Sequence, residues 1–304
     1  MATLGRKIAT WVNDLEYQDL DEGTIHEVKR RVIDSIGCAL GAYHSDPGRI
    51  TRALAESRND SRAGMVLGTR HRTSPELAAF ANGTLIRYLD YNDTYLSLEP
   101  AHPSDNLSAA IAVTQATGKS GQDAILATVI GYEIQCRLCD AASLRAHGWD
   151  HVYYGALSTA MLAGKLWGLS EEALEHALGL AGVCNIATRQ TRTGQMSMWK
   201  ACAFANAARN GVFAADLARR GLTGPNEMFE GPKGIFSQLT GPFELKLGRK
   251  DDLMVKRTYI KYWPAEYHSQ SAIEAVLAMR SEIGGRKIRS IHIGSFEAAV
   301  SIIG

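Results

Sequence analysis

The sequence has few cysteines and no excess of either charge. Its 304 residues include five cysteines, an odd number. These lie mostly in apolar segments, as expected of reduced thiols in a cytosol-like compartment. Lys plus Arg number 33 and Asp plus Glu number 32, which gives a formal net charge of +1. That balance argues against a broad nucleic-acid-binding face and against a polybasic membrane patch. Any anion-binding site must therefore be local.

Long apolar runs and nucleotide-binding fingerprints are missing as well. No apolar stretch approaches the length that a bilayer requires, and the first residues do not have the pattern of a secretory signal. The chain has neither a G-x-G-x-x-G motif after a strand nor a Walker-type Gly-Lys-Ser/Thr. We therefore expect a cytoplasmic protein without membrane or nucleic-acid partners.

Helix signals dominate the chain up to about residue 258. Ser120-Gly-Gln-Asp and Ser170-Glu-Glu are typical helix N-termini, and Thr24-Ile-His-Glu matches a capping box. Segments 154–168 and 201–217 are rich in alanine and glycine, which allows helices to approach closely. Isoleucines alternate over residues 288–293 as in a strand. The pattern predicts a mainly α protein, with an all-helical domain over residues 1–258 and the start of a smaller α/β lid domain over 259–304.

The densest polar cluster covers residues 90–94 and 99–106. It begins where a predicted helix ends, and it continues through a proline-punctuated loop. His102 precedes Pro103, which disfavours helical backbone there and lets the ring project. Loops held on a rigid scaffold often carry catalytic groups. Two interpretations stay open, a catalytic loop and a loop whose polar residues only cap helix ends.

Three further clusters have both functional and structural interpretations. His147 and His151 are four residues apart, but Gly148 weakens a helical zinc site and no third ligand has a recognised spacing. Lys200 opens a largely apolar segment, so it either extends to solvent or is held inward as a functional cation. Residues 261–270 combine aromatic residues, a proline and charged groups at the predicted domain boundary, where pockets often form.

Cys136 and Cys139 have the spacing of a metal or cluster motif. They lie in a segment with a helical pattern, and the sequence has no second pair of this kind. A structural zinc or an iron–sulfur cluster needs more thiolates at suitable spacing. We therefore interpret both as small core residues.

Five segments taken together resemble the MmgE/PrpD family, in the right order and at plausible separations. They are Arg87–Thr94, His102–Asn106, Asp150-His151, Lys200 and Trp263–Gln270. The family includes 2-methylcitrate dehydratase, cis-aconitate decarboxylase and iminodisuccinate epimerase. Each motif alone is weak, but five in order are specific, and the likeness covers essentially the whole chain.

The resemblance implies a large helical domain with an α/β lid, a homodimer, and an active site in the cleft between the domains that works without a metal or organic cofactor. The matching active-site positions are Asp90, Thr94, His102, His151, Lys200 and Lys261. The His-Pro-Ser-Asp-Asn form is closest to the 2-methylcitrate dehydratase branch. The chain departs from that branch at Glu99-Pro-Ala, where a Trp-Gly pair is usual, and in its longer segment 193–200.

Dehydration of a 3-hydroxy tricarboxylate would require cations beside two proton-transfer groups. A proton is removed next to a carboxylate while hydroxide leaves the neighbouring carbon, so negative charge develops on the carboxylate. Without a metal, Lys200, Lys261 and Arg192 are the available cations.

Two histidines suit the proton transfers near neutral pH. We expect His102 and His151 to serve as acid and base, and which is which stays open. Asp90 would orient a catalytic partner, while Thr94 and His268 would bind the substrate.

Three functions are compatible with these residues and motifs. The favoured one is a cofactor-independent lyase that dehydrates a di- or tricarboxylate, with conversion of 2-methylcitrate to 2-methyl-aconitate as the best candidate. The second is a decarboxylase or epimerase of the same family. The third is a non-catalytic helical scaffold whose polar clusters only cap helices. Because family chains are considerably longer, we also expect the 304 residues to be part of a longer protein.

Overall fold

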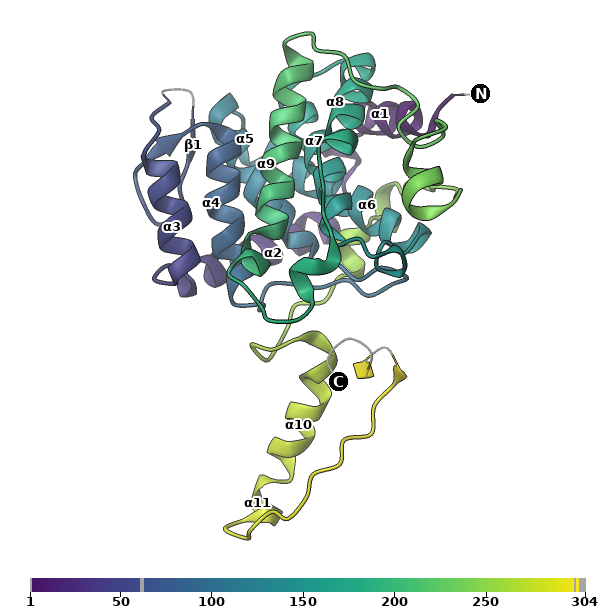
Figure 1. The fold of residues 1–304 in the computed structure, drawn as a ribbon. Helices are drawn as coiled ribbons and strands as arrows, with labels where there is room; N and C mark the ends of the chain where they lie inside the picture. The colour runs from purple at the N-terminus through teal and green to yellow at the C-terminus, as the bar shows by residue number, and fades with distance from the viewer. Residues whose placement is uncertain (1, 61–62, 298, 301–304) are drawn as a thin grey trace.

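The computed structural model describes residues 2–60, 63–297 and 299–300, and this part of the chain is mainly helical, as predicted. Nine of its α-helices form one body (Figure 1). They are α1 (Leu4–Asp14), α2 (Glu22–Gly41), α3 (Asp46–Glu56), α4 (Pro75–Tyr88), α5 (Leu107–Thr117), α6 (Gly121–Ala141), α7 (Val152–Trp167), α8 (Glu171–Val183) and α9 (Trp199–Arg219).

Helix α9 packs against three other helices of the body, α4, α7 and α8. Small residues make this close approach possible, as the alanine- and glycine-rich segments predict. A Cβ atom on Gly211 would lie 2.6 Å from the carbonyl oxygen of Ala156 on α7. A Cβ on Gly155 would lie 2.4 Å from the ring of Phe204 on α9. The facing helices are therefore in direct backbone-to-side-chain contact.

Two of the predicted helix starts are confirmed and one is wrong. Ser120 forms a capping box with Asp123, and the Ser170 hydroxyl accepts a hydrogen bond from the N–H of Ala173. Helix α2, however, begins three residues before the predicted start, because Asp21 is its N-cap and accepts a hydrogen bond from the N–H of Thr24. Thr24 lies inside the first turn. Aspartate is as good a cap as threonine, so the pattern alone did not decide between them.

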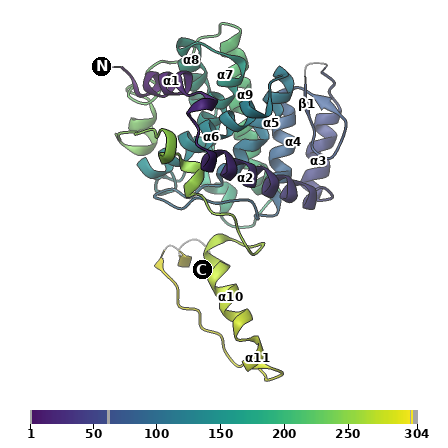
Figure 2. The same ribbon diagram turned by 180° about the vertical axis from the view of Figure 1, so that it is seen from behind.

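The C-terminal segment projects away from the body and carries α10 (Gln270–Ala278) and α11 (Arg280–Ile283), as the view from behind also shows (Figure 2). The sheet found among the described residues has two short antiparallel strands, β1 (Gly64–Met65) and β2 (Arg72–Thr73). The strand predicted over residues 288–293 is not formed, because no described segment pairs with it. The α/β lid therefore stays a prediction.

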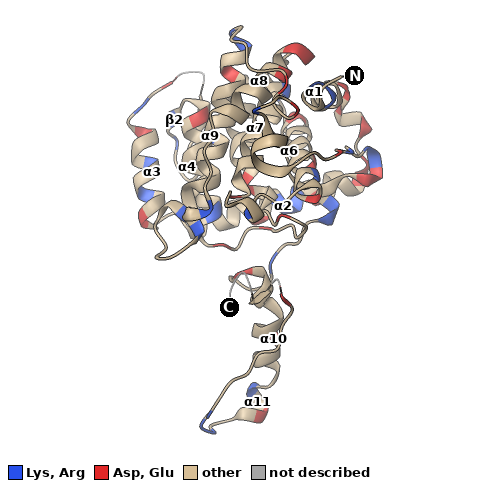
Figure 3. Ribbon diagram, turned by 45° about the vertical axis from the view of Figure 1, so that its right-hand side comes forward, with Lys and Arg blue, Asp and Glu red and all other residues tan. Residues whose placement is uncertain are grey.

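Charged residues of both signs are spread over the body rather than gathered on one face (Figure 3). None of the described helices combines the length and apolar character that a membrane span requires.

Candidate active site

Asp90 lies just beyond the end of α4, in an unusual backbone conformation. Its φ angle is +52°, in the left-handed region that aspartate tolerates better than most residues with a side chain. Its N–H donates to the carbonyl of Arg87, 3.1 Å away, in the last turn of the helix. Backbone strain of this kind concentrates at functional sites. The turn holds the Asp90 carboxylate against neighbouring segments.

Three cationic side chains meet at this carboxylate. Nη1 of Arg87 lies 2.7 Å from Oδ1, and Nζ of Lys261 lies 2.9 Å from the same oxygen. Nζ of Lys200 lies 3.5 Å from Oδ2. Burial alone would raise the pKa of Asp90, but its charged neighbours, Arg87 first, lower it below the ordinary value. Three positive charges thus surround one negative charge, and the surplus favours binding of an anion.

Lys261 reaches the site from the segment that leaves the body. Thr94 and Tyr259 exchange two backbone hydrogen bonds, of 2.9 and 2.8 Å, which fixes this segment against the loop after α4. The Lys261 side chain is fully buried, and its Nζ also donates to the carbonyl oxygen of Asp90 at 2.6 Å. The Thr94 hydroxyl donates to the carbonyl of Ala101, 3.2 Å away. In this structure Thr94 therefore anchors the loop and the strand-like pairing with Tyr259.

His102 has one ring nitrogen held by the backbone and the other directed toward Asp90. Its backbone lies outside the helical region, as its position before Pro103 predicts. Nδ1 is 2.8 Å from the carbonyl oxygen of Asp93. Because a carbonyl oxygen only accepts, Nδ1 carries the proton. In the neutral ring the lone pair is then on Nε2, which lies 4.0 Å from Oδ1 of Asp90.

Burial and nearby cations keep the His102 ring neutral. Burial, with the charges of Arg87 and Lys261, lowers the pKa of His102 well below its ordinary value. The Asp93 carboxylate fixes the backbone that holds the ring, because it accepts hydrogen bonds from the Ser104 N–H at 2.9 Å and the Tyr132 hydroxyl at 2.8 Å. His102 is thus a rigid, neutral imidazole.

His151 is arranged in a similar way on a separate loop. It is the N-cap of α7, and its Nδ1 lies 3.0 Å from Oδ1 of Asp150. Its Nε2 is buried without a hydrogen-bond partner among the described residues. Burial lowers the pKa of His151, while the Asp150 carboxylate opposes that shift. The rings of His102 and His151 make an edge contact, with their centroids 5.8 Å apart.

Arg192 acts on this pair through Asp150. It lies in the short helix η4 (Arg189–Arg192), and its Nε and Nη2 donate to the two oxygens of Asp150 at 2.7 and 3.2 Å. Burial alone would raise the pKa of Asp150, but its neighbours His151 and Arg192 lower it below the ordinary value. Arg192, Asp150 and His151 therefore form a fixed chain of hydrogen bonds.

A small pocket opens where α4 ends and α9 begins. Its volume is about 140 Å³. It is lined by Arg87, Tyr88, Asp90, Ser197, Met198, Lys200 and Ala201. The Lys200 side chain is 41% exposed, so this lysine lies at the rim with its charge turned toward Asp90. Lys200 is thus a partly exposed cation paired with Asp90, and its role as a functional cation stays a prediction.

His268 is the one predicted site residue that the structure places elsewhere. Its Nδ1 lies 2.7 Å from Oε1 of Glu266, and its ring lies against Phe296. It lines a separate cavity of about 500 Å³, formed mainly by α10 and by residues 291–295, 299 and 300. The remaining predicted residues belong to one connected cluster around Asp90 and the two histidines.

The residues considered as metal ligands are not grouped as such a site requires. Among the described residues no cluster of three or more His, Cys, Asp or Glu side chains could hold a metal ion. Gly148 has a φ angle of +79° and separates His147 from α7, so the two histidines do not share a helix. Cys136 and Cys139 are buried free thiols in α6, as predicted.

Sequence reasoning missed two buried charges that complete the site. Arg87 lies three residues before Asp90, a spacing that places both near one face at the helix end, and this was the available signal. Asp105 is fully buried behind Arg87, with its Oδ2 3.8 Å from the guanidinium Nε. Burial raises the pKa of Asp105 to about 7. No local pattern distinguishes this carboxyl from an ordinary helix cap.

Comparison with known proteins identifies related chains. Residues 6–248 match the MmgE/PrpD N-terminal domain. A probable 2-methylcitrate dehydratase of Saccharomyces cerevisiae is 32% identical over 89% of this chain and 58% of its own length. The mitochondrial 2-methylcitrate dehydratase of Yarrowia lipolytica is 30% identical over 97% of this chain and 61% of its own. A cis-aconitate decarboxylase-like protein of Aspergillus oryzae is 30% identical over 76% of this chain and 50% of its own. The chain spans at most about three fifths of the length of these relatives.

Proposed function

Since the chain belongs to the MmgE/PrpD family, we propose that it is a cofactor-independent hydro-lyase that dehydrates a hydroxy tricarboxylate, with 2-methylcitrate as the favoured substrate. One observation carries the proposal. Arg87, Lys200 and Lys261 meet at Asp90, beside two histidines whose Nε2 atoms are free of any hydrogen-bond partner within 3.5 Å among the described residues. Such a site offers positive charge for carboxylates and two groups for proton transfer.

The surroundings of the two histidines suggest different roles. His102 is neutral, its Nδ1–H is fixed on a carbonyl, and its neighbours are cations. These features favour a general base that removes the proton next to a substrate carboxylate through Nε2. His151 has the Asp150 carboxylate behind Nδ1. That carboxylate stabilises an imidazolium, so His151 is assigned as the acid that protonates the departing hydroxyl.

The cations would stabilise the charge that forms between these two steps. When the base removes the proton, negative charge spreads onto the neighbouring carboxylate of the substrate. Lys200, which lines the pocket, and Lys261, which is buried against Asp90, are placed to neutralise carboxylates. Asp90 holds both lysines in position, and through them the substrate. Thr94 and His268 remain candidates for substrate contacts, the second one from the C-terminal segment.

A decarboxylase is the second candidate, because one of the related chains is named cis-aconitate decarboxylase-like. Decarboxylation also leaves negative charge that cations must stabilise, so the same cluster would serve both reactions. The distinction therefore depends on the substrate and the products.

The deciding experiment is incubation of the purified protein with 2-methylcitrate, citrate, cis-aconitate and iminodisuccinate. Alkene formation, carbon dioxide release and optical rotation are followed separately. We expect alkene formation from 2-methylcitrate, unchanged after exhaustive chelation. Carbon dioxide release from cis-aconitate would instead identify a decarboxylase, and a change in optical rotation alone would identify an epimerase. No turnover together with no thermal shift for any acid would favour a scaffold.

A further inference from the structure

A buried carboxylate, Glu99, connects the loops that carry the two histidines. The residue is 1% exposed. One of its oxygens, Oε2, accepts three hydrogen bonds from a neighbouring loop. The donors are the Ser143 hydroxyl at 2.9 Å and the backbone N–H groups of Leu144 at 2.8 Å and Arg145 at 2.9 Å. One carboxylate oxygen thus accepts hydrogen bonds from three consecutive residues of the turn at 143–145.

The two connected loops each lead directly to one histidine. Glu99 lies in segment 95–101, which Tyr95 and Ala101 close with two backbone hydrogen bonds of 2.8 and 2.9 Å, and His102 follows at once. On the other side, the Leu144 carbonyl accepts a hydrogen bond from the Trp149 N–H at 3.1 Å, immediately before Asp150 and His151. Hydrogen bonds of Glu99 therefore connect the loop before His102 with the loop before His151.

The second carboxylate oxygen of Glu99 does not take part in holding the loop. Its Oε1 is buried without a hydrogen-bond partner among the described residues, as is Nε2 of His151. A buried charged oxygen without a partner costs free energy. A neutral glutamine would offer its carbonyl oxygen to the same three donors and avoid that cost. The loop contacts alone thus do not explain why the residue is acidic.

We infer that Glu99 is a positioning residue, which fixes the Asp150–His151 loop relative to His102 and places a negative charge close to that loop. The inference rests on the proposed function, in which His151 acts as an acid. In the described part of the chain, the charged or titratable groups around His151 include Asp150 on its own loop, Arg192 from η4, His102 and Glu99. Of these, Asp150 and Glu99 raise the pKa of His151, while Arg192 lowers it.

The substitution Glu99→Gln separates charge from packing, because the side chains have the same shape. The matched control is Glu133→Gln on α6. Glu133 is also fully buried and accepts backbone N–H groups from a distant segment, Gly248 at 2.6 Å and Met254 at 2.8 Å. Both variants are examined by thermal unfolding, by nuclear magnetic resonance titration of the His151 ring, and by turnover as a function of pH.

We expect both variants to fold, but only Glu99→Gln to lower the pKa of His151. Turnover of Glu99→Gln should fall about tenfold or more, through kcat rather than KM, with the limb of the pH profile that reports the acid moved to lower pH. An unchanged His151 titration in a folded Glu99→Gln protein would overturn the inference.

A second variant covers the case in which Glu99→Gln does not fold. Glu99→Asp keeps the charge but shortens the side chain, so it should lower kcat and leave the His151 titration near that of the unsubstituted protein. Unchanged kcat in Glu99→Asp would contradict the positioning role. The ring titration needs no substrate, so it tests Glu99 even if the protein turns over none of the acids. Failure of the proposed function and failure of this inference are therefore distinguishable.

Discussion

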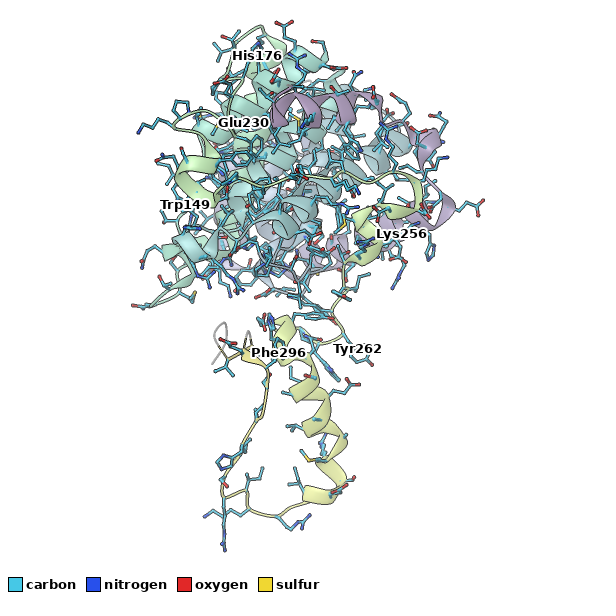
Figure 4. The ribbon with its side chains drawn as sticks, turned by 90° about the vertical axis from the view of Figure 1, so that its right-hand side faces the viewer. Trp149, His176, Glu230, Lys256, Tyr262 and Phe296 are labelled. Atoms are coloured by element: carbon cyan, nitrogen blue, oxygen red, sulfur yellow. The ribbon has the colours of Figure 1, made fainter. Side chains whose placement is uncertain are left out.

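The helical body and the C-terminal segment differ sharply in how far they bury their side chains. In the body, helices such as α7 and α9 bury most of their residues in a common core. In the segment, neither α10 nor α11 has a buried residue. Figure 4 shows Tyr262 and Phe296 at the junction of the two regions, with the segment extending beyond them. Groups that need a fixed geometry are thus expected in the body.

Two residues of the connecting segment show what this difference means for the site. Lys261 lies just after the pairing of Tyr259 with Thr94, and its buried side chain contacts Asp90. His268 lies seven residues later and contacts Glu266 and Phe296 within the segment itself. The acid–base and cationic groups are therefore assembled by the body and by the first anchored residues after it.

Core substitutions give the largest expected difference between the regions. Ile130 on α6 is fully buried, whereas Val276 on α10 is 46% exposed. Ile130→Ala should lower the free energy of unfolding by about 2–5 kcal/mol, and Val276→Ala by less than about 0.5 kcal/mol. Denaturant unfolding measures both. Equal losses would show that α10 buries its face against something and would remove the contrast.

Loss of a proton-transfer group in the body should cost activity rather than folding. His102→Gln is expected to lower turnover by about a hundredfold or more, because the neutral Nε2 base is gone. The matched control is His176→Gln on α8, where Nδ1 of the ring lies 3.2 Å from the Gly224 carbonyl oxygen. Steady-state kinetics and thermal unfolding are compared for both. Near-normal turnover by the His102→Gln variant would remove this residue from the mechanism.

The pH dependence of folding stability tests whether the Asp105 carboxyl is buried in the folded protein. Because the pKa of this carboxyl is raised to about 7 in the folded protein, its ionisation opposes folding. The free-energy cost of burying the ionised carboxylate is absent below a pH of about 4 and fully present above about 7. Asp105→Asn removes it, so the stability of the variant relative to the unsubstituted protein should rise by about 4 kcal/mol between these limits.

The measurement is denaturant unfolding of both proteins at several pH values. Glu274→Gln on α10 is the control, since Glu274 is exposed and its curve should run parallel to that of the unsubstituted protein. If the Asp105→Asn curve is parallel as well, the carboxyl is not held in the low-dielectric setting that the body provides.

Lys200 should give the smallest of these effects. Lys200→Met keeps the apolar stem and removes the charge at the pocket rim, so the fold should persist while the KM for the tricarboxylate rises about tenfold. Lys246→Met serves as a control, because Lys246 lies outside the pocket. Unchanged kinetics in the Lys200→Met variant would mean that the side chain simply extends to solvent.

Local signals predicted the helices well, because caps and small-residue faces are encoded within a few residues. Ser120 and Ser170 begin helices where expected, and the glycine-rich faces of α7 and α9 meet. The strand expected over residues 288–293 is not formed, because a strand depends on a partner from another part of the chain. Alternation of isoleucine cannot supply one.

The site was predictable only in part. The motifs singled out Asp90, His102 and the lysines, which the fold brings together from segments more than a hundred residues apart. Asp105 and Glu99 were not recognised as parts of the site, since their importance comes from burial and from contacts made across the fold. The sequence places them beside His102 but does not show which groups they face.

The most direct test of the acid–base pair is the tautomeric state of the two histidines in the substrate-free protein. Nitrogen-15 magnetic resonance distinguishes a ring protonated on Nδ1 from one protonated on Nε2 or on both. Both rings should carry a proton on Nδ1, because the Asp93 carbonyl oxygen and the Asp150 carboxylate accept it there, and His102 should be neutral at neutral pH. A proton on Nε2 of His102, or an Nδ1 of His151 that carries none, would contradict the proposed proton transfers.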